Sequence, residues 1–148
     1  MMCGNNSVKG TLVTGVIGED VHVTGIRILE HALRNAGFKV NSLGIHNTQD
    51  DFVNAAVETD ADAIMISSLA GHATLLVEGL REKCIESGLE NIRLYLGGQL
   101  VIHAEEWEKT EKTFKDMGFD RVYQPFVLPE PVIADLKKDL GIEDKGLK

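Results

Sequence analysis

Ala63-Ile64-Met65-Ile66-Ser67 is a short, nearly uninterrupted apolar run that ends at a serine. A strand with one solvated face alternates apolar and polar residues, whereas a strand that is covered on both faces is apolar throughout. The run therefore predicts a central strand of a parallel sheet. Four further β-branched or apolar runs occur along the chain, at Leu12–Ile17, Lys39–Leu43, Arg93–Leu96 and Arg121–Tyr123.

The segments between these runs have the apolar spacing of amphipathic helices. Thr48, with Asp51 three residues later, is expected to cap the second helix. Glycine accepts the left-handed conformation that follows a helix C-terminus, and four helices are expected to end at Gly37, Gly88, Gly118 and Gly141.

This alternation of strands and helices predicts the fold class. It favours a flavodoxin-like, doubly wound α/β fold with five parallel strands and helices on both faces of the sheet. The length suits one domain, so we expect residues 1–148 to form a single domain with flexible tails at 1–10 and 142–148.

The composition argues against several classes of partner. The net charge is −8, from 15 basic and 23 acidic residues, and the basic residues form no run. Nucleic-acid binding needs clustered positive charge, and a bilayer crossing needs about 20 consecutive apolar residues. The first residues lack the apolar stretch of a signal peptide. Cys3 and Cys84 are expected to be free thiols, which is typical of a cytoplasmic protein.

Ligands of doubly wound folds bind at the carboxyl ends of the strands, so the segments that follow the strands carry the functional prediction. Gly18–Gly25 follows the first strand and contains Asp20 and His22, which point to one side of an extended segment. A carboxylate that accepts one imidazole N–H leaves the other ring nitrogen available to a metal. A solvated loop in which Asp20 caps a helix is the alternative, and this short pattern does not separate the two.

Small residues follow the third and fourth expected strands. Ser67-Ser68-Leu69 is the first such segment, and Gly97-Gly98-Gln99 is the second. Two hydroxyl groups and paired glycines leave room for a flat group against the backbone. Ordinary turns, with a serine as a helix cap, are the alternative. All three segments are expected at one edge of the sheet, which favours a shared ligand.

The combined pattern resembles the cobalamin-binding signature of the mutases and of methionine synthase. Asp20-x-His22-x-x-Gly25, Ser67-x-Leu69 and Gly97-Gly98 follow one another at the spacing of that signature. Within this superfamily the chain is most similar to the small subunits of glutamate mutase. Four longer stretches carry that closer resemblance, at Gly15–Gly18, His31–Phe38, Gly79–Cys84 and Met117–Tyr123.

The resemblance implies a role for each segment. In the family, the imidazole of the motif replaces the cofactor's own benzimidazole on cobalt, so His22 is expected to be the lower axial ligand and Asp20 its hydrogen-bond partner. Ser67 is expected to hydrogen-bond the detached benzimidazole. The whole set of expected cofactor-binding residues is Glu19, Asp20, Val21, His22, Val23, Gly25, Ser67, Ser68, Leu69, Gly97, Gly98, Gln99, Leu100, Val101, Ile102 and His103.

The resemblance also implies the reaction and the assembly. The family interconverts L-glutamate and (2S,3S)-3-methylaspartate by a radical rearrangement that depends on adenosylcobalamin. A dicarboxylate substrate calls for arginine, and the expected cofactor loops contain none. We therefore expect a larger subunit of the TIM-barrel type that binds the substrate, in an assembly of two small and two large subunits. No catalytic residue is expected on this chain beyond His22.

Two related functions stay open at this point, namely a corrinoid carrier of a methyltransferase system and the small subunit of another cobalamin-dependent mutase. Carriers usually have a helical cap before the first strand, which here is expected near Thr11. A signalling receiver would need an acceptor aspartate where Ser67 stands and a lysine where Gln124 stands. A flavin site would need a phosphate loop where Gly18-Glu19-Asp20 is acidic. The receiver and the flavin site are set aside.

Overall fold

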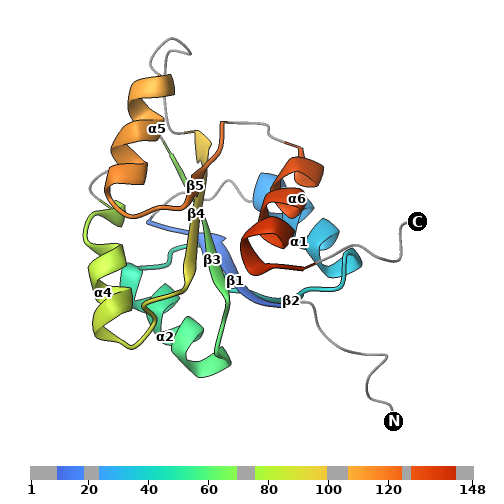
Figure 1. The fold of residues 1–148 in the computed structure, drawn as a ribbon, viewed down its shortest axis with the longest axis horizontal. Coiled ribbons are helices and arrows are strands. Elements are labelled where there is room, and N and C mark those ends of the chain that lie inside the picture. Colours follow the sequence, from blue (N-terminus) through green and yellow to red (C-terminus); the bar gives the residue numbers. More distant parts are fainter. Residues whose placement is uncertain (1–9, 19–23, 70–75, 100–106, 125–127, 143–148) are drawn as a thin grey trace.

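The protein is an open sheet covered by helices on both faces (Figure 1). The computed structural model describes residues 10–18, 24–69, 76–99, 107–124 and 128–142. Five parallel strands form the sheet in the order β2-β1-β3-β4-β5. Their bounds are β1 Thr11–Val16, β2 Lys39–Ser42, β3 Ala63–Leu69, β4 Arg93–Gln99 and β5 Arg121–Val122. The predicted fold class is confirmed.

Helices α1 and α6 cover one face, and helices α2, α4 and α5 cover the other (Figure 1). Their bounds are α1 Thr24–Asn35, α2 Gln49–Thr59, α4 Leu80–Glu86, α5 Trp107–Asp116 and α6 Pro129–Leu140. The strand order changes direction between β1 and β3, because β2 lies outside β1 while β4 and β5 lie beyond β3. A doubly wound sheet binds its ligands at the carboxyl edge near this switch point.

Alternate residues of each strand build two separate cores, since successive side chains of a strand point to opposite faces. Ile64 and Ile66 of β3 pack in the core beneath α2, α4 and α5, with Phe52 of α2. Met65 of the same strand packs in the core beneath α1 and α6, with Leu33 of α1. The continuous apolar run of β3 is therefore buried on both sides, as its sequence predicted.

The helix ends follow the local sequence signals. Gly37, Gly88, Gly118 and Gly141 all have positive φ angles, of 101°, 86°, 109° and 71°. The side chain of Thr48 accepts a hydrogen bond from the backbone of Asp51, whose own side chain accepts one from the backbone of Thr48. Both predictions are confirmed.

The ends of β3 and β4 differ from the prediction. The sequence suggested that β3 ends at Ser67 and β4 at Leu96, with turns beyond. Instead Ser67–Leu69 and Gly97–Gln99 continue their strands and pair with each other. The ladder continues because each segment supplies the backbone partner of the other, which local propensity does not reveal.

The described ends of the chain pack against the fold. Gly10 is buried, and Ile142 packs against the core beneath α1 and α6. The rest of the two expected tails lies outside the described residues. Among the helices of the described residues, none combines the length and the hydropathy of a membrane span.

Candidate cofactor site

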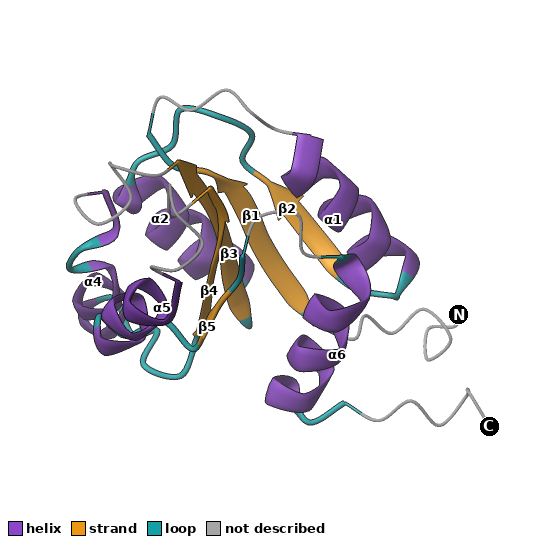
Figure 2. Cartoon of the chain, turned by 90° about the horizontal axis from the view of Figure 1, so that it is seen from above, coloured by secondary structure: helices purple, strands orange, loops and turns teal. Residues whose placement is uncertain are grey.

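The carboxyl edge of the sheet brings two of the three sequence motifs into direct contact. In the register of β3 and β4, Ser67 is opposite Gly97, Ser68 is opposite Gly98 and Leu69 is opposite Gln99. Val16 of β1 is opposite Ser67 on the other side of β3. Val16, Ser67 and Gly97 thus form one row across three neighbouring strands, at the edge toward which the strand arrows point (Figure 2).

The two serines face opposite sides of the sheet. Ser67 alternates with Met65, which belongs to the core beneath α1 and α6, so its hydroxyl lies on that face. Ser68 lies on the other face, is 1% exposed, and its Oγ has no hydrogen-bond partner in the part of the chain that the structure describes. The side chains of Ser67 and Ser68 therefore face opposite sides of the sheet, and the expected role of Ser68 in the slot stays a prediction. A buried hydroxyl without a partner is costly and calls for an explanation, and the described residues give none.

The paired glycines serve two different purposes. Gly98 has a φ of 104°, and a Cβ there would lie 2.4 Å from the Ser68 carbonyl oxygen, so the fold itself requires glycine. Gly97 has no such constraint, since a Cβ would meet only the Cβ of Tyr123, at an ordinary 3.7 Å, among the described residues. A Cβ at Gly25 would meet no described atom within 4 Å. Among the described residues, therefore, nothing obstructs a group that approaches Gly97 or Gly25.

Tyr123 closes this row at its far end and was missed by the sequence prediction. It is half-buried, its hydroxyl donates a 2.8 Å hydrogen bond to Asp135 of α6, and its ring stacks edge-to-face on Tyr95 with centroids 6.0 Å apart. Tyr123 directly follows the short strand β5, and that position was the available signal. Its packing ties α6 to the carboxyl edge.

A charged network extends this contact along α6. Arg121 donates to both carboxylate oxygens of Asp139, at 3.1 and 2.9 Å, and Tyr95 also donates to Asp139. The hydrogen bonds from Arg121 are the main reason why the pKa of Asp139 lies below its usual value. Burial, together with the hydrogen bond to Asp139, raises the pKa of Tyr95. Each group is held in the state that keeps the network intact.

The turn after β2 lies at the same edge and has an unusual backbone. His46 is exposed with a φ of 62°, which is uncommon for a residue other than glycine. Its neighbour Asn47 is buried, and Asn47 Nδ2 donates to the carbonyl oxygens of Gly44 at 2.9 Å and Val16 at 3.2 Å. Asn47 therefore holds this turn against the end of β1.

The remaining expected site residues lie outside the described residues. They are Glu19, Asp20, Val21, His22 and Val23 between β1 and α1, and Leu100, Val101, Ile102 and His103 after β4. The described residues on either side do flank the edge. Gly18 ends the β1 segment, with its backbone N–H donating to the carbonyl oxygen of Asn47 at 2.9 Å, and α1 begins at Thr24.

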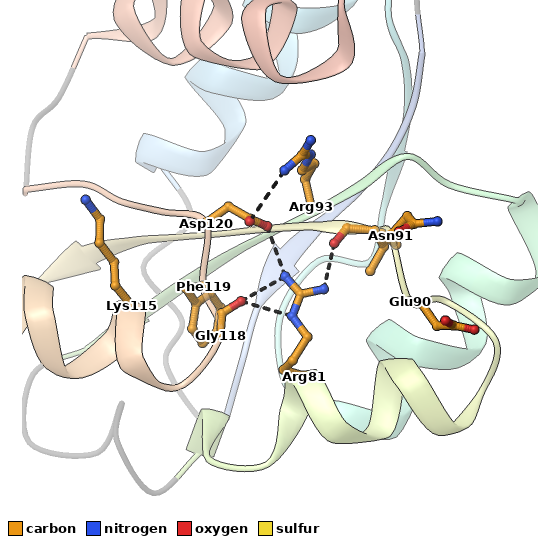
Figure 3. A pocket seen from close by; sticks show the side chains of 9 residues that line it. Arg81, Glu90, Asn91, Arg93, Lys115, Gly118, Phe119 and Asp120 are labelled. Carbon is orange, nitrogen blue, oxygen red and sulfur yellow. Dashed lines mark hydrogen bonds and ion pairs between the residues drawn. The ribbon is translucent and has the colours of Figure 1, made fainter.

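A pocket of about 490 Å³ lies at the opposite, amino-terminal edge of the sheet (Figure 3). Arg81 of α4 dominates it and donates to the carbonyl oxygens of Ile92 and Gly118 and to the carboxylate of Asp120. A Cβ on Gly118 would lie 2.6 Å from the Cβ of Arg81, so glycine is needed for this contact. The guanidinium group of Arg81 donates its hydrogen bonds to groups of the protein itself. We therefore interpret Arg81 and these acceptors as a structural clamp.

The comparison with known families agrees with the geometry of the carboxyl edge. The B12 binding domain family matches residues 10–122 of the chain. The chain therefore belongs to the family of B12-binding domains.

Curated relatives define a narrower group. The glutamate mutase sigma subunit of Clostridium cochlearium is 55% identical over 135 residues, which cover 91% of this chain and 98% of that protein. The sigma subunit of Carboxydothermus hydrogenoformans is 53% identical over 131 residues, with 88% and 96% covered. Within the B12-binding class, the chain belongs with the glutamate mutase sigma subunits.

Solved structures agree on the fold. A cobalamin-binding protein from Desulfitobacterium hafniense has a TM-score of 0.71 at 18% identity, over 88% of this chain and 58% of that one. The monomethylamine corrinoid protein of Methanosarcina barkeri also has a TM-score of 0.71, at 21% identity, over 89% and 60%. The receiver domain of NarL from Mycobacterium tuberculosis reaches 0.65 at 13% identity, over 91% and 98%. At these identities the likeness concerns the fold alone.

Proposed function

We propose that this chain is the cofactor-binding subunit of a cytoplasmic glutamate mutase, which interconverts L-glutamate and (2S,3S)-3-methylaspartate and takes adenosylcobalamin as its cofactor. The observation that carries the proposal is the paired edge of β3 and β4, where Ser67 lies opposite Gly97 and a Cβ at Gly97 would meet only Tyr123 among the described residues. The sigma subunits that share about half of the sequence support the same function.

The described residues fit a long, flat group. Ser67 and Gly97 offer one hydroxyl and one bare backbone position side by side, and the fully buried Val16 continues the row on β1. A nucleotide tail needs such a surface, because an aromatic base gains from apolar contact and its ring nitrogen from one hydrogen bond. In our proposal Ser67 Oγ makes that hydrogen bond, and Tyr123 limits the far end of the slot.

His22 is proposed to bind cobalt from below, with Asp20 accepting the N–H of the other ring nitrogen. An imidazole whose second nitrogen is fixed by a carboxylate has a defined tautomer and a higher basicity. A corrin would supply most of the ligands of cobalt itself, so a single protein ligand would be sufficient. When bound, adenosylcobalamin supplies the radical that starts the rearrangement. The work of this chain is to hold the imidazole in place and to exclude water from the slot.

The partner is proposed to be a larger TIM-barrel subunit that binds glutamate, in an assembly of two small and two large subunits. The described residues of the proposed slot, Ser67, Gly97 and Tyr123, include no arginine, which is the residue best suited to bind two carboxylates. Substrate recognition is therefore assigned to the partner.

Electron paramagnetic resonance of the cobalt(II) form tests the axial ligand. Nitrogen-15 labelling of the protein's histidines should change the superhyperfine splitting, whereas the same label in the cofactor's benzimidazole should leave it unchanged. His22→Ala should abolish the histidine signal, and His46→Ala, a control at the same edge, should retain it. A splitting that follows the benzimidazole label would overturn the proposed coordination.

A further inference from the structure

The exposed face of α1 is basic, although the whole chain carries a net charge of −8. Arg27, His31 and Arg34 are exposed on this helix, together with Ile28, which is 55% exposed. The only acidic residue of α1 is Glu30. Glu30 is 5% exposed and accepts a 2.5 Å hydrogen bond from Thr14 of β1, so its carboxylate is directed into the fold.

The two arginines of α1 are available to a partner. Arg27 makes no hydrogen bond or ion pair with any described residue, and Arg34 donates only one 3.2 Å bond, to the carbonyl oxygen of Val40. By contrast, Arg81 and Arg121 are each engaged by aspartate side chains of the protein itself. An unpaired guanidinium group is a strong, planar binding group for a carboxylate.

A pocket lies between these arginines and the edge strand β2. Its volume is about 290 Å³, and its lining residues are Ile26, Arg27, Glu30, Arg34, Ser42 and Gly44. Two guanidinium groups and one inward-facing carboxylate leave one net positive charge. The pocket is of a size to accept one or two side chains, and its charge favours acidic ones.

The position of the pocket indicates which molecule supplies the acidic side chains that would bind in it. Helix α1 begins at Thr24, at the carboxyl edge, two residues after His22 in the sequence. Arg27 lies in the first turn of this helix, Ser42 ends β2, and Gly44 lies in the turn that follows. A subunit that covers a corrin bound at His22 must therefore extend close to this pocket.

We propose that the α1–β2 pocket receives an acidic segment of the larger subunit, with carboxylates on Arg27 and Arg34 and an apolar contact on Ile28. This inference rests on the proposed function, since it requires a partner at the carboxyl edge. Opposite charges at an interface mainly accelerate and orient association, and their effect falls as salt rises.

Charge reversal at Arg27 tests the inference. Arg27→Glu should weaken binding of the larger subunit by about tenfold or more at 50 mM salt, and the deficit should shrink at 300 mM salt. Lys39→Glu is the matched control, because Lys39 is exposed at the amino-terminal end of the same edge strand and the change in charge is equal. The control should bind as wild type does.

The readouts separate this inference from the proposed function. Visible absorbance follows corrinoid binding to the small chain, and biolayer interferometry follows its assembly with the larger subunit. Failure of the wild-type chain to bind corrinoid would overturn the proposed function itself. Normal corrinoid binding with wild-type assembly of Arg27→Glu would overturn only the docking surface. Sedimentation of the small chain alone as a salt-sensitive dimer that Arg27→Glu dissociates would assign the pocket to a second copy and also overturn it.

Discussion

Replacing Gly97 with alanine should change the affinity for the cofactor without lowering the stability of the fold. The added methyl group would lie 3.7 Å from the Cβ of Tyr123, which is an ordinary contact. The backbone at Gly97 does not have a positive φ, so alanine fits without strain. Glycine within a strand costs about 0.5–1 kcal/mol relative to alanine. The free energy of unfolding of Gly97→Ala should therefore stay the same or rise by up to about 1 kcal/mol.

The affinity of Gly97→Ala for the corrinoid, in contrast to its stability, should fall. A methyl group placed in a filled slot costs about 1–3 kcal/mol, which corresponds to roughly 5- to 150-fold weaker binding. Gly98→Ala is the comparison, because its Cβ would lie 2.4 Å from the Ser68 carbonyl oxygen at a φ of 104°. That variant should lose at least about 2 kcal/mol of stability.

Two measurements on the purified chain are sufficient. Urea unfolding followed by circular dichroism gives the stabilities without cofactor, and titration with adenosylcobalamin followed by visible absorbance gives the affinities. If Gly97→Ala binds the corrinoid as tightly as wild type does, the tail does not pass over Gly97, and the slot proposed along β3 and β4 is wrong.

Three further predictions concern stability. Arg81→Met should lower the free energy of unfolding by about 2–4 kcal/mol, because the carbonyl oxygens of Gly118 and Ile92 lose this donor and Asp120 keeps only its contacts with Leu94 and Arg93. Urea unfolding checks it, and a loss below about 0.5 kcal/mol would contradict the clamp. Because the pKa of Asp139 is lowered in the folded state, its carboxylate contributes stability above the usual aspartate pKa of about 4, and this stability should be lost as the pH falls through the lowered pKa. Asp139→Asn should therefore make the free energy of unfolding depend less on pH in the acid range, and an unchanged pH dependence would refute this. Thr48→Ala should cost about 1 kcal/mol through loss of the capping box, measured by thermal unfolding against Thr59→Ala, a control at the other end of the same helix.

Features with local causes were predictable from the sequence. The strand β3 follows from an apolar run, the cap at Thr48 from a polar residue with Asp51 at the right spacing, and the end of α5 from Gly118. Each depends on residues within one or two turns of the position concerned. The fold class followed from the order of such elements.

Features with distant partners were not predictable in this way. Ser67–Leu69 stays in a strand because it pairs with Gly97–Gln99, far along the chain. The contact of Tyr123 with Asp135 likewise depends on how α6 lies over the sheet. The opposite orientation of Ser67 and Ser68 follows from strand periodicity, but only once both are known to lie in a strand. The roles of Asp20 and His22 came from resemblance and stay predictions.

The distribution of polar contacts explains how an open edge is compatible with a stable fold. At the amino-terminal edge, Arg81 joins α4 to the start of β4 and to the turn before β5. At the carboxyl edge, a Cβ at Gly97 would meet only the Cβ of Tyr123, at 3.7 Å, among the described residues. A ligand-binding edge must leave such space unfilled, which forgoes packing contacts and therefore costs stability. Clamps at the opposite edge offset that cost without obstructing the slot. Substitutions in the Arg81 clamp should therefore lower stability without changing corrinoid affinity, and Gly97→Ala should lower corrinoid affinity without loss of stability.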